Sequence, residues 1–306
     1  MSDHFPVLLD EVIETLITDI DGVYVDCTLG FAGHSSSILK KISKHGFLIG
    51  LDLDPYALNK AEKKLKETGK EQFSVHHASY KQFPEVLSKL GIDKVSGFLF
   101  DLGISSYQID SEHRGFSYMR EGPLDMRFNP QGEKTAKDVL SEISEKELIE
   151  ILQTYAEISH ADKIAKSIIH ERNKNNMNTT SDLKIAISNA TNGICSNKIL
   201  SRIFQALRIT VNDEIQTFKD TLSKIPNYLV KGGRVCVISF HSIEDRIAKH
   251  FFKDSVIINE YDYYDRSKLD SSKKLNVLTK KPIVATRDEV FKNTRSRSAK
   301  LRAAQL

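Results

Sequence analysis

Several features that the sequence lacks narrow what this chain can be. Its 306 residues contain no apolar stretch close to the roughly 18 residues of a membrane-spanning helix. The first residues include Asp3 and His4 and show no basic region ahead of an apolar core, so we expect no signal peptide. No internal repeat or low-complexity tract is present. We therefore expect a cytoplasmic globular protein, with room for one large α/β domain plus an insertion or for two domains.

Cysteine is scarce, and its spacing does not suit a metal. Cys27, Cys195 and Cys236 are odd in number and lie far apart in the chain. The pair His76-His77 has no third or fourth ligand at metal spacing, so we predict no metal site. The three cysteines are interpreted as reduced cytosolic thiols, two of which pack inside strands.

The glycine pattern is also incomplete. Gly30-x-x-Gly33 follows the apolar residues 23–25 and opens an amphipathic stretch, but it lacks the full G-x-G-x-x-G of dinucleotide-binding proteins. A second apolar strand ends on Asp52, 26 residues after Asp26. An acid at this place hydrogen-bonds ribose hydroxyls in Rossmann-like folds. A crevice that recognises ribose without a strong pyrophosphate cradle suits S-adenosylmethionine, although strand-turn-helix units are common in other proteins too.

The alternation of strand and helix patterns predicts a mostly parallel sheet. Further strands are expected at 73–76 and at 95–100, the latter ending on Asp101. Four successive βα units predict right-handed crossovers between parallel strands. A fifth strand at 234–239 runs into His241, and residues 256–258 and 283–285 are expected to form a final antiparallel pair.

The alternation stops after Ser105 and resumes near Asn212, with only helical patterns between them. Ser144 and Glu147 form a predicted capping box, Thr180 is expected to cap another helix, and one long helix is expected from Phe204 to Leu222 or beyond. We therefore predict an inserted all-helical domain at 106–212. The α/β domain would be discontinuous, formed by 1–105 and 213–306.

Charge is distributed unevenly along the chain. Residues 279–306 carry eight Lys or Arg against two acids, a net charge of +6, in a chain whose total is +3, so the remainder carries −3. A basic C-terminal tail on a slightly acidic body suggests contact with a phosphate backbone. A solvated, partly disordered terminus is the alternative interpretation.

Eight motifs, in order along almost the whole chain, resemble one family. They are 4–9 (HFPVLL), 26–35 (DCTLGFAGHS), 101–108 (DLGISSYQ), 114–117 (RGFS), 122–127 (GPLDMR), 204–212 (FQALRITVN), 238–246 (ISFHSIEDR) and 295–302 (RSRSAKLR). The chain is thereby identified as similar to the bacterial 16S ribosomal RNA cytosine N4-methyltransferases, which modify the decoding centre. The resemblance implies a Rossmann-like class I S-adenosylmethionine-dependent methyltransferase sheet, with the helical insertion recognising the substrate.

The resemblance also implies which residues contact S-adenosylmethionine. They are the residues that match the family's positions, namely Ala32, Gly33, His34, Asp52, Tyr80, Asp101 and Gln108. Amides at the helix start near Gly33 and His34 would bind the methionine carboxylate. The family usually has glycine in place of Ala32 and phenylalanine in place of Tyr80. Because a methyl group restricts φ, Ala32 weakens the expectation of a left-handed conformation at this turn.

Candidate residues for the chemistry follow from their places at strand ends and loops. Asp101 lies beside the expected topological switch point and is the candidate acceptor for an N–H of the target amine. Asp125 and His241 are further catalytic candidates, and segments carrying Arg127 and Glu244 are expected to converge near them. An ion-pair network is an equally plausible role for Arg127, Glu244 and Asp245. The predicted RNA contacts are Arg127, Arg295, Arg297, Lys300 and Arg302.

Other functions remain compatible with the crevice. One is a catalytically inactive ribosome-assembly factor that keeps only its RNA contacts; intact Asp52, Asp101 and Gln108 argue against it. Another is a nicotinamide-dependent oxidoreductase, against which the missing glycine pattern counts. The expected partner is 16S RNA in the small ribosomal subunit. Whether that RNA is free or assembled, and whether the chain acts alone or as a homodimer, is left open by the sequence.

Overall fold

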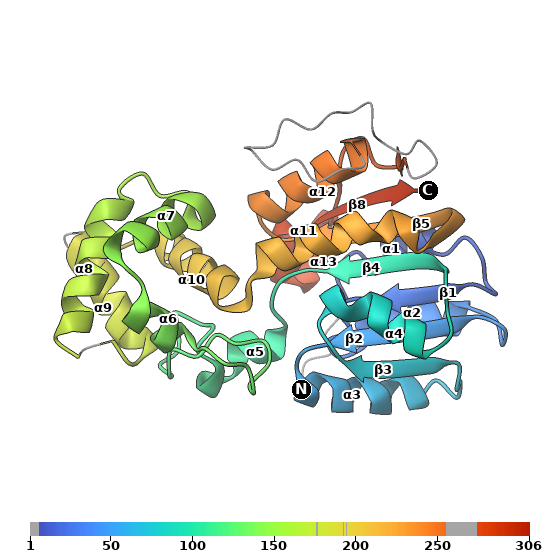
Figure 1. The fold of residues 1–306 in the computed structure, drawn as a ribbon, viewed down its shortest axis with the longest axis horizontal. Helices are drawn as coiled ribbons and strands as arrows, with labels where there is room; N and C mark the ends of the chain where they lie inside the picture. Colours follow the sequence, from blue (N-terminus) through green and yellow to red (C-terminus); the bar gives the residue numbers. More distant parts are fainter. Residues whose placement is uncertain (1–5, 176, 192, 194, 255–273) are drawn as a thin grey trace. The chain divides into compact units, whose positions relative to one another are not determined.

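A computed structural model describes residues 6–254 and 274–306 except 176, 192 and 194 (Figure 1). The chain forms two compact units, Met1–Gly103 with Gln216–Leu306, and Ile104–Ile215. The expected insertion at 106–212 lies within the bounds of the second unit. His4 and Phe5 of the first motif, and the expected strand at 256–258, lie outside the described residues.

The first unit contains one sheet with the strand order β3-β2-β1-β4-β5-β8-β6, and β7 pairs with β8 (Figure 1). The strands are β1 (Val23–Asp26), β2 (Phe47–Asp52), β3 (Phe73–His77), β4 (Val95–Asp101), β5 (Leu229–Ser239), β6 (Asn276–Val277), β7 (Ile283–Val284) and β8 (Lys300–Gln305). β1 to β5 are parallel, and β6, β7 and β5 pair antiparallel with β8. The Rossmann-like methyltransferase fold class is thereby confirmed. The strand order reverses between β1 and β4, where open α/β sheets bind ligands.

Helices cover both faces of this sheet, and successive side chains of β4 point alternately to the two core clusters beneath them. Phe98 and Phe100 belong to one core cluster, whereas Leu99 belongs to the other. The Phe98 face packs against α4 (Phe83–Lys89), α11 (Glu214–Lys224) and α12 (Ser242–Asp254), and the Leu99 face packs against α1 (Leu9–Leu16), α2 (Gly33–Lys41) and α3 (Pro55–Lys66). All of the residues of β4 up to Phe100 are buried, as expected for a central parallel strand.

The end of the chain corrects the sequence-based expectation. Residues of the basic tail form β8 beside β5, so a solvated terminus is the wrong interpretation for this part. β8 was not predicted from the sequence, and the expected strand near 283–285 pairs with it as β7. Leu301, Ala303 and Ala304 are fully buried, and Arg302 is 6% exposed. The charge of Arg302 obscured the strand pattern, because its guanidinium is paired inside the fold with Asp245.

The second unit is helical. Its elements are α5 (Ser106–Asp110), the short 3-10 helix η2 (Glu112–Arg114), α6 (Ala136–Glu142), α7 (Glu145–Ala156), α8 (Ala161–Asn173), α9 (Thr180–Ala190) and α10 (Asn197–Asn212). The predicted capping box of Ser144 and Glu147 is confirmed at the start of α7. The expectation for Thr180 is wrong by one residue, since the Thr179 side chain caps α9. Leu152, Ile164 and Leu183 lie in one apolar core.

The long helix expected from Phe204 to Leu222 is two helices. α10 ends at Asn212 and α11 begins at Glu214, because Asp213 adopts a left-handed conformation with φ 48°. Asn212 stabilises this break: its Nδ2 donates to Met126 O at 2.7 Å, and its Oδ1 accepts from Phe128 N at 2.7 Å. Apolar periodicity continues through the break, so the sequence pattern alone could not reveal it.

Candidate active site

The turn between β1 and α2 is shaped by two residues in the left-handed region. Gly30 has φ 51°, and Ala32, the residue before α2, has φ 55° and ψ 41°. The expectation that alanine weakens the case for this conformation is therefore wrong. Ala32 is fully buried, so its packing offsets the roughly 1–2 kcal/mol that a left-handed conformation costs an L-residue.

Asp52 ties the end of β2 to this turn. Its Oδ2 accepts from Gly30 N at 2.7 Å, and its Oδ1 accepts from Asp54 N at 2.8 Å. Burial raises the pKa of Asp52, although these hydrogen bonds oppose the rise. Each carboxylate oxygen has a second lone pair, so the same acid can still accept from vicinal hydroxyls.

The start of α2 presents amides that precede the first helical hydrogen bond. Ser36 N donates to Ala32 O at 3.0 Å, so the N–H groups of residues 33–35 come before it. A Cβ at Gly33 would lie 2.6 Å from Pro6 Cγ, which explains why glycine occupies this position. This first turn is suited to an anionic group.

Three titratable side chains meet where the strand order reverses. Asp26 ends β1, Asp101 ends β4, and His34 lies in the first turn of α2. His34 Nε2 lies 2.9 Å from Val7 O, and because a carbonyl only accepts, Nε2 carries the hydrogen. In the neutral ring, Nδ1 then presents a lone pair 3.6 Å from Asp101 Oδ2. Burial lowers the pKa of His34, which favours this neutral form.

Asp26 is the buried member of this group and was missed as a site residue by the sequence analysis. It is 1% exposed and accepts from Ser35 Oγ at 2.7 Å. Burial raises its pKa to about 6, and Asp101 contributes further to the rise. The signal in the sequence that could have indicated Asp26 is its place as an acid at the end of the first apolar strand.

Asp101 differs from Asp26 in having an unused oxygen. Its backbone N–H donates to Thr28 Oγ1 at 2.6 Å, yet its Oδ1 is buried without a hydrogen-bond partner among the described residues. The side chain is 28% exposed. Burial raises the pKa of Asp101 to about 7, and repulsion from Glu244 adds to the rise. The carboxyl group is thus poised to exchange a proton near neutral pH.

His241 and Glu244 form a second group directly after β5. His241 Nε2 lies 3.0 Å from Glu244 Oε1, and both side chains are less than a tenth exposed. Glu244 Oε2 accepts from Phe240 N at 2.9 Å, which fixes the entry into α12. Although His241 Nε2 and Glu244 Oε1 are close, Nε2 makes no hydrogen bond of acceptable geometry among the described residues, and the predicted catalytic role of His241 stays a prediction.

Tyr80 begins the short 3-10 helix η1 (Tyr80–Gln82) after β3. Its ring meets that of Phe100 edge to face, with the ring centres 5.6 Å apart. The side chain is partly buried against the core below it. Stacking of adenine on this ring remains a prediction.

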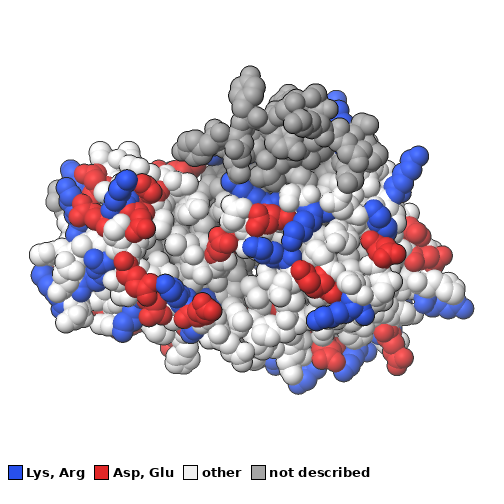
Figure 2. Space-filling view, viewed as in Figure 1, with Lys and Arg blue, Asp and Glu red and all other residues white. Residues whose placement is uncertain are grey.

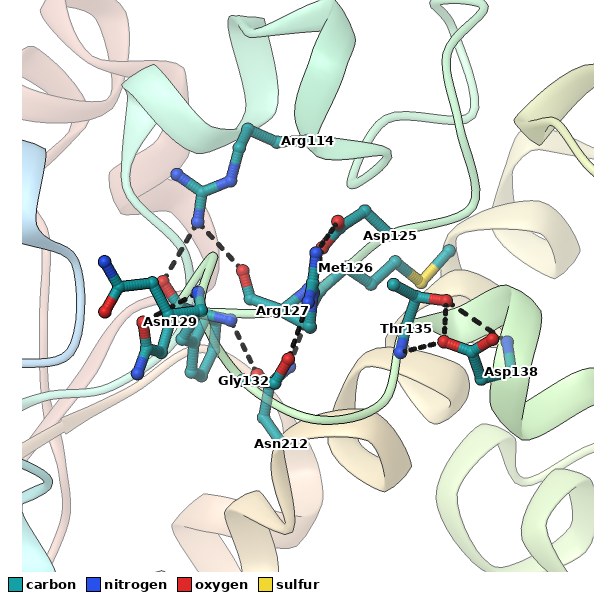
Figure 3. A network of polar contacts seen from close by, with 11 residues as sticks. Arg114, Asp125, Met126, Arg127, Asn129, Gly132, Thr135, Asp138 and Asn212 are labelled. Atoms are coloured by element: carbon teal, nitrogen blue, oxygen red, sulfur yellow. Dashed lines mark hydrogen bonds and ion pairs between the residues drawn. The ribbon is translucent and has the colours of Figure 1, made fainter.

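The remaining predicted site residues belong to the second unit. Gln108 caps α5, since its Oε1 accepts from Ser105 N at 3.0 Å. Arg127 and Asp125 form a bidentate ion pair, in which Arg127 Nε donates to Asp125 Oδ1 at 3.0 Å and Arg127 Nη2 donates to Asp125 Oδ2 at 2.6 Å (Figure 3). Arg127 Nη1 also donates to Gly132 O at 2.6 Å. The expected convergence of this pair with His241 and Glu244 stays a prediction.

Arg114 organises the loop around this pair. Its Nη2 donates to the carbonyl oxygens of Arg127 and Phe128 at 2.8 and 3.0 Å (Figure 3). The rings of Phe116 and Phe128 stack with centres 5.9 Å apart, and Arg114 lies over Phe116. Arg114 was not among the predicted site residues, although it belongs to the motif at 114–117.

The four predicted RNA contacts near the C-terminus are not equivalent. Arg302 donates to Asp245 Oδ1 at 2.6 Å and is nearly buried, so its assignment to RNA is corrected to a structural ion pair. Lys300 also reaches Asp245, at 3.1 Å, and is 41% exposed. Arg295 and Arg297 lie in the 3-10 helix η6 (Thr294–Ser298), where Arg297 is exposed.

Within the described residues, no cluster of three or more His, Cys, Asp or Glu side chains could hold a metal ion. No helix of the described part of the chain is long and apolar enough to cross a membrane. The arrangement combines a carboxyl of raised pKa, the free amides of a helix start, and an acid at the end of β2.

Comparison with known proteins gives one consistent result. The model of the MraW methylase family matches residues 1–306. A protein of Caldicellulosiruptor saccharolyticus is 43% identical, with 100% of this chain and 99% of that protein covered. Proteins of Clostridioides difficile and Thermosipho africanus are 40% and 44% identical, covering 99% of this chain and 98% and 97% of themselves. All three are named ribosomal RNA small subunit methyltransferase H.

Proposed function

Because the chain belongs to the MraW methylase family and is an S-adenosylmethionine-dependent methyltransferase, we propose that it methylates a cytosine of small-subunit ribosomal RNA. The target atom is the exocyclic N4, and the target nucleotide lies in the decoding centre of 16S RNA. The names of the relatives support the RNA class, and the unused Oδ1 of Asp101 supports an amine target.

The residues present fit the donor. The amides that open α2 would hold the methionine carboxylate, and Asp52 would accept from the ribose hydroxyls. Tyr80 offers an aromatic ring at the end of β3 for the adenine. Bound S-adenosylmethionine supplies a methyl group that its sulfonium has already activated. Positioning for in-line transfer is therefore the main task left to the protein.

Asp101 carries the acid–base part of the proposal. The N4 lone pair of cytosine is delocalised into the ring, so an acceptor for an N4 hydrogen increases electron density on the nitrogen during attack. The Asp101 side chain is 28% exposed, so a ligand can reach its carboxyl, and its pKa is raised to about 7; it is therefore the candidate acceptor. A proton taken up by this carboxyl faces the Nδ1 lone pair of His34, which can share it.

The helical unit would recognise the RNA. A cytosine inside a stacked or paired RNA cannot present N4 to a donor, so the base must be splayed out. We assign the recognition of RNA shape to the second unit and a contact with RNA to Arg127. The pairing of Arg127 with Asp125 makes it a rigidly held cation rather than a mobile one.

The test is nucleoside mass spectrometry of 16S RNA from cells that lack this protein. The proposal predicts loss of N4-methylation at one cytosine and its return when the wild-type gene is supplied. The Asp101→Asn variant should restore ribosome association without restoring the methyl group. Unchanged N4-methylation in the deletion strain contradicts the proposal, and return of the methyl group with Asp101→Asn contradicts the role assigned to this carboxyl.

A further inference from the structure

The most exposed large apolar side chain in the described part of the protein is Phe291. It lies on α13 (Arg287–Lys292) and is 90% exposed, compared with 70% for Met119, the next most exposed. Single exposed apolar side chains are common on soluble proteins, so exposure alone indicates nothing. The surroundings of Phe291 distinguish it.

Phe291 lies in α13, which together with η6 carries several exposed basic side chains. Arg287, Lys292 and Arg297 are all exposed in α13 and η6, and we call these three with Phe291 the α13 surface. The nearby acid Glu289 is engaged inside the fold, because its Oε1 accepts from Leu8 N at 2.8 Å. Across the face drawn in Figure 2, basic and acidic side chains are interspersed. The exposed charged side chains of α13 and η6 are therefore Arg287, Lys292 and Arg297 together with the acid Asp288, which leaves these two elements net positive.

The α13 surface is joined to the catalytic centre by a short series of contacts within one unit. Glu289 Oε1 accepts a hydrogen bond from Leu8 N, and the carbonyl oxygen of the neighbouring Val7 accepts from His34 Nε2. His34 in turn faces Asp101. A polymer bound on α13 therefore lies against the element that supports the active-site histidine.

We propose that the α13 surface binds single-stranded RNA adjacent to the target nucleotide, with Phe291 stacking on an unpaired base. Arg287, Lys292 and Arg297 contact the neighbouring phosphates. The combination suits RNA because every base offers a flat π-face and each linkage carries a negative charge. This inference rests on the proposed RNA substrate, and it names the surface that holds the strand outside the active site.

The absence of tryptophan from the chain allows a direct test. Phe291→Trp introduces a single fluorophore, and stacking on a base quenches indole emission. Decameric oligoadenylate should quench it, whereas polyphosphate of similar charge should not. Val284→Trp is the matched control, because Val284 is 57% exposed on the nearby β7 and lies outside the proposed surface. Equal quenching by polyphosphate, or quenching only by anionic lipid vesicles, overturns the proposal.

Removal of the ring gives the second measurement. Phe291→Ala should weaken binding of oligoadenylate and of small ribosomal subunits about tenfold, within the range of one lost base stack. Val284→Ala should leave both unchanged, and circular dichroism checks that each variant is folded. If wild-type protein binds subunits and Phe291→Ala binds equally well, this inference alone fails. If wild-type protein binds no RNA, the proposed function fails as well.

Discussion

The acids at the ends of β1 and β4 in the α/β unit are held differently from the buried ion pair of the helical unit. In the α/β unit, Asp26 and Asp101 lie close together with raised pKa values, and one oxygen of Asp101 has no hydrogen-bond partner among the described residues. In the helical unit, Arg208 and Glu214 are equally buried but bind each other through two hydrogen bonds of 2.7 and 2.9 Å. Asp125 and Arg127 do the same.

The difference indicates which charged groups can change their protonation state and which hold a fixed geometry. A satisfied ion pair holds its geometry and keeps its charge state, so it is suited to shaping a binding surface. A buried carboxyl with an unused oxygen is costly to ionise and is ready to accept a proton from a ligand.

Arg208→Ala should destabilise the protein by about 3–5 kcal/mol, because it leaves Glu214 buried without its partner. Urea unfolding measures the change. The paired replacement Arg208→Met with Glu214→Leu should recover much of the loss, since no isolated charge remains. A loss below about 1 kcal/mol for the single variant would show that the pair is not a structural element of the break between α10 and α11.

Asp52→Ala should weaken binding of S-adenosylmethionine by removing charge-assisted hydrogen bonds worth about 1.5–3 kcal/mol each. Calorimetric titration gives the affinity. Asp54→Ala is the matched control: its side chain caps α3 by accepting from Tyr56 N, so it should lower stability without an equal loss of affinity. Wild-type affinity in folded Asp52→Ala rules out the ribose role.

Asp101→Asn should stabilise the protein at pH 8 by about 1–2 kcal/mol and have a smaller effect at pH 5. The folded-state pKa of about 7 exceeds the ordinary value, so the folded protein binds more protons between about pH 4 and 7. Wild-type stability therefore falls as pH rises through this window, and the amide removes that fall. Urea unfolding at both pH values measures it, and an identical pH dependence in the two proteins contradicts the assignment.

Ala32→Gly should raise stability slightly, by less than about 1 kcal/mol, since glycine relieves the left-handed backbone but loses a buried methyl group. Ala61→Gly is the control: Ala61 is also fully buried but lies inside α3, so glycine there should destabilise by roughly 1 kcal/mol or more. Thermal unfolding compares both with wild type. Equal destabilisation by the two substitutions would argue against strain at Ala32.

The parallel part of the sheet could be predicted from the sequence because each strand is a short apolar run that ends on an acid or a turn. The same pattern located Asp52 and Asp101 at strand ends. β8 could not be found this way, because its pattern contains Arg302, whose charge is neutralised only by the distant Asp245. The break at Asp213 likewise depends on hydrogen bonds between Asn212 and the backbone of Met126 and Phe128, some 85 residues away. The spacing of apolar residues along the chain carries no information about such a distant contact.

The unused oxygen of Asp101 is tested most directly by the single-turnover rate of methyl transfer to small subunits, measured against pH at saturating S-adenosylmethionine. We expect the wild-type rate to rise with pH and to level off above about pH 7, as the carboxyl group ionises. Asp101→Asn should be slower by on the order of 100-fold and should lack this rise. A variant with the wild-type rate and the wild-type pH profile would contradict the account.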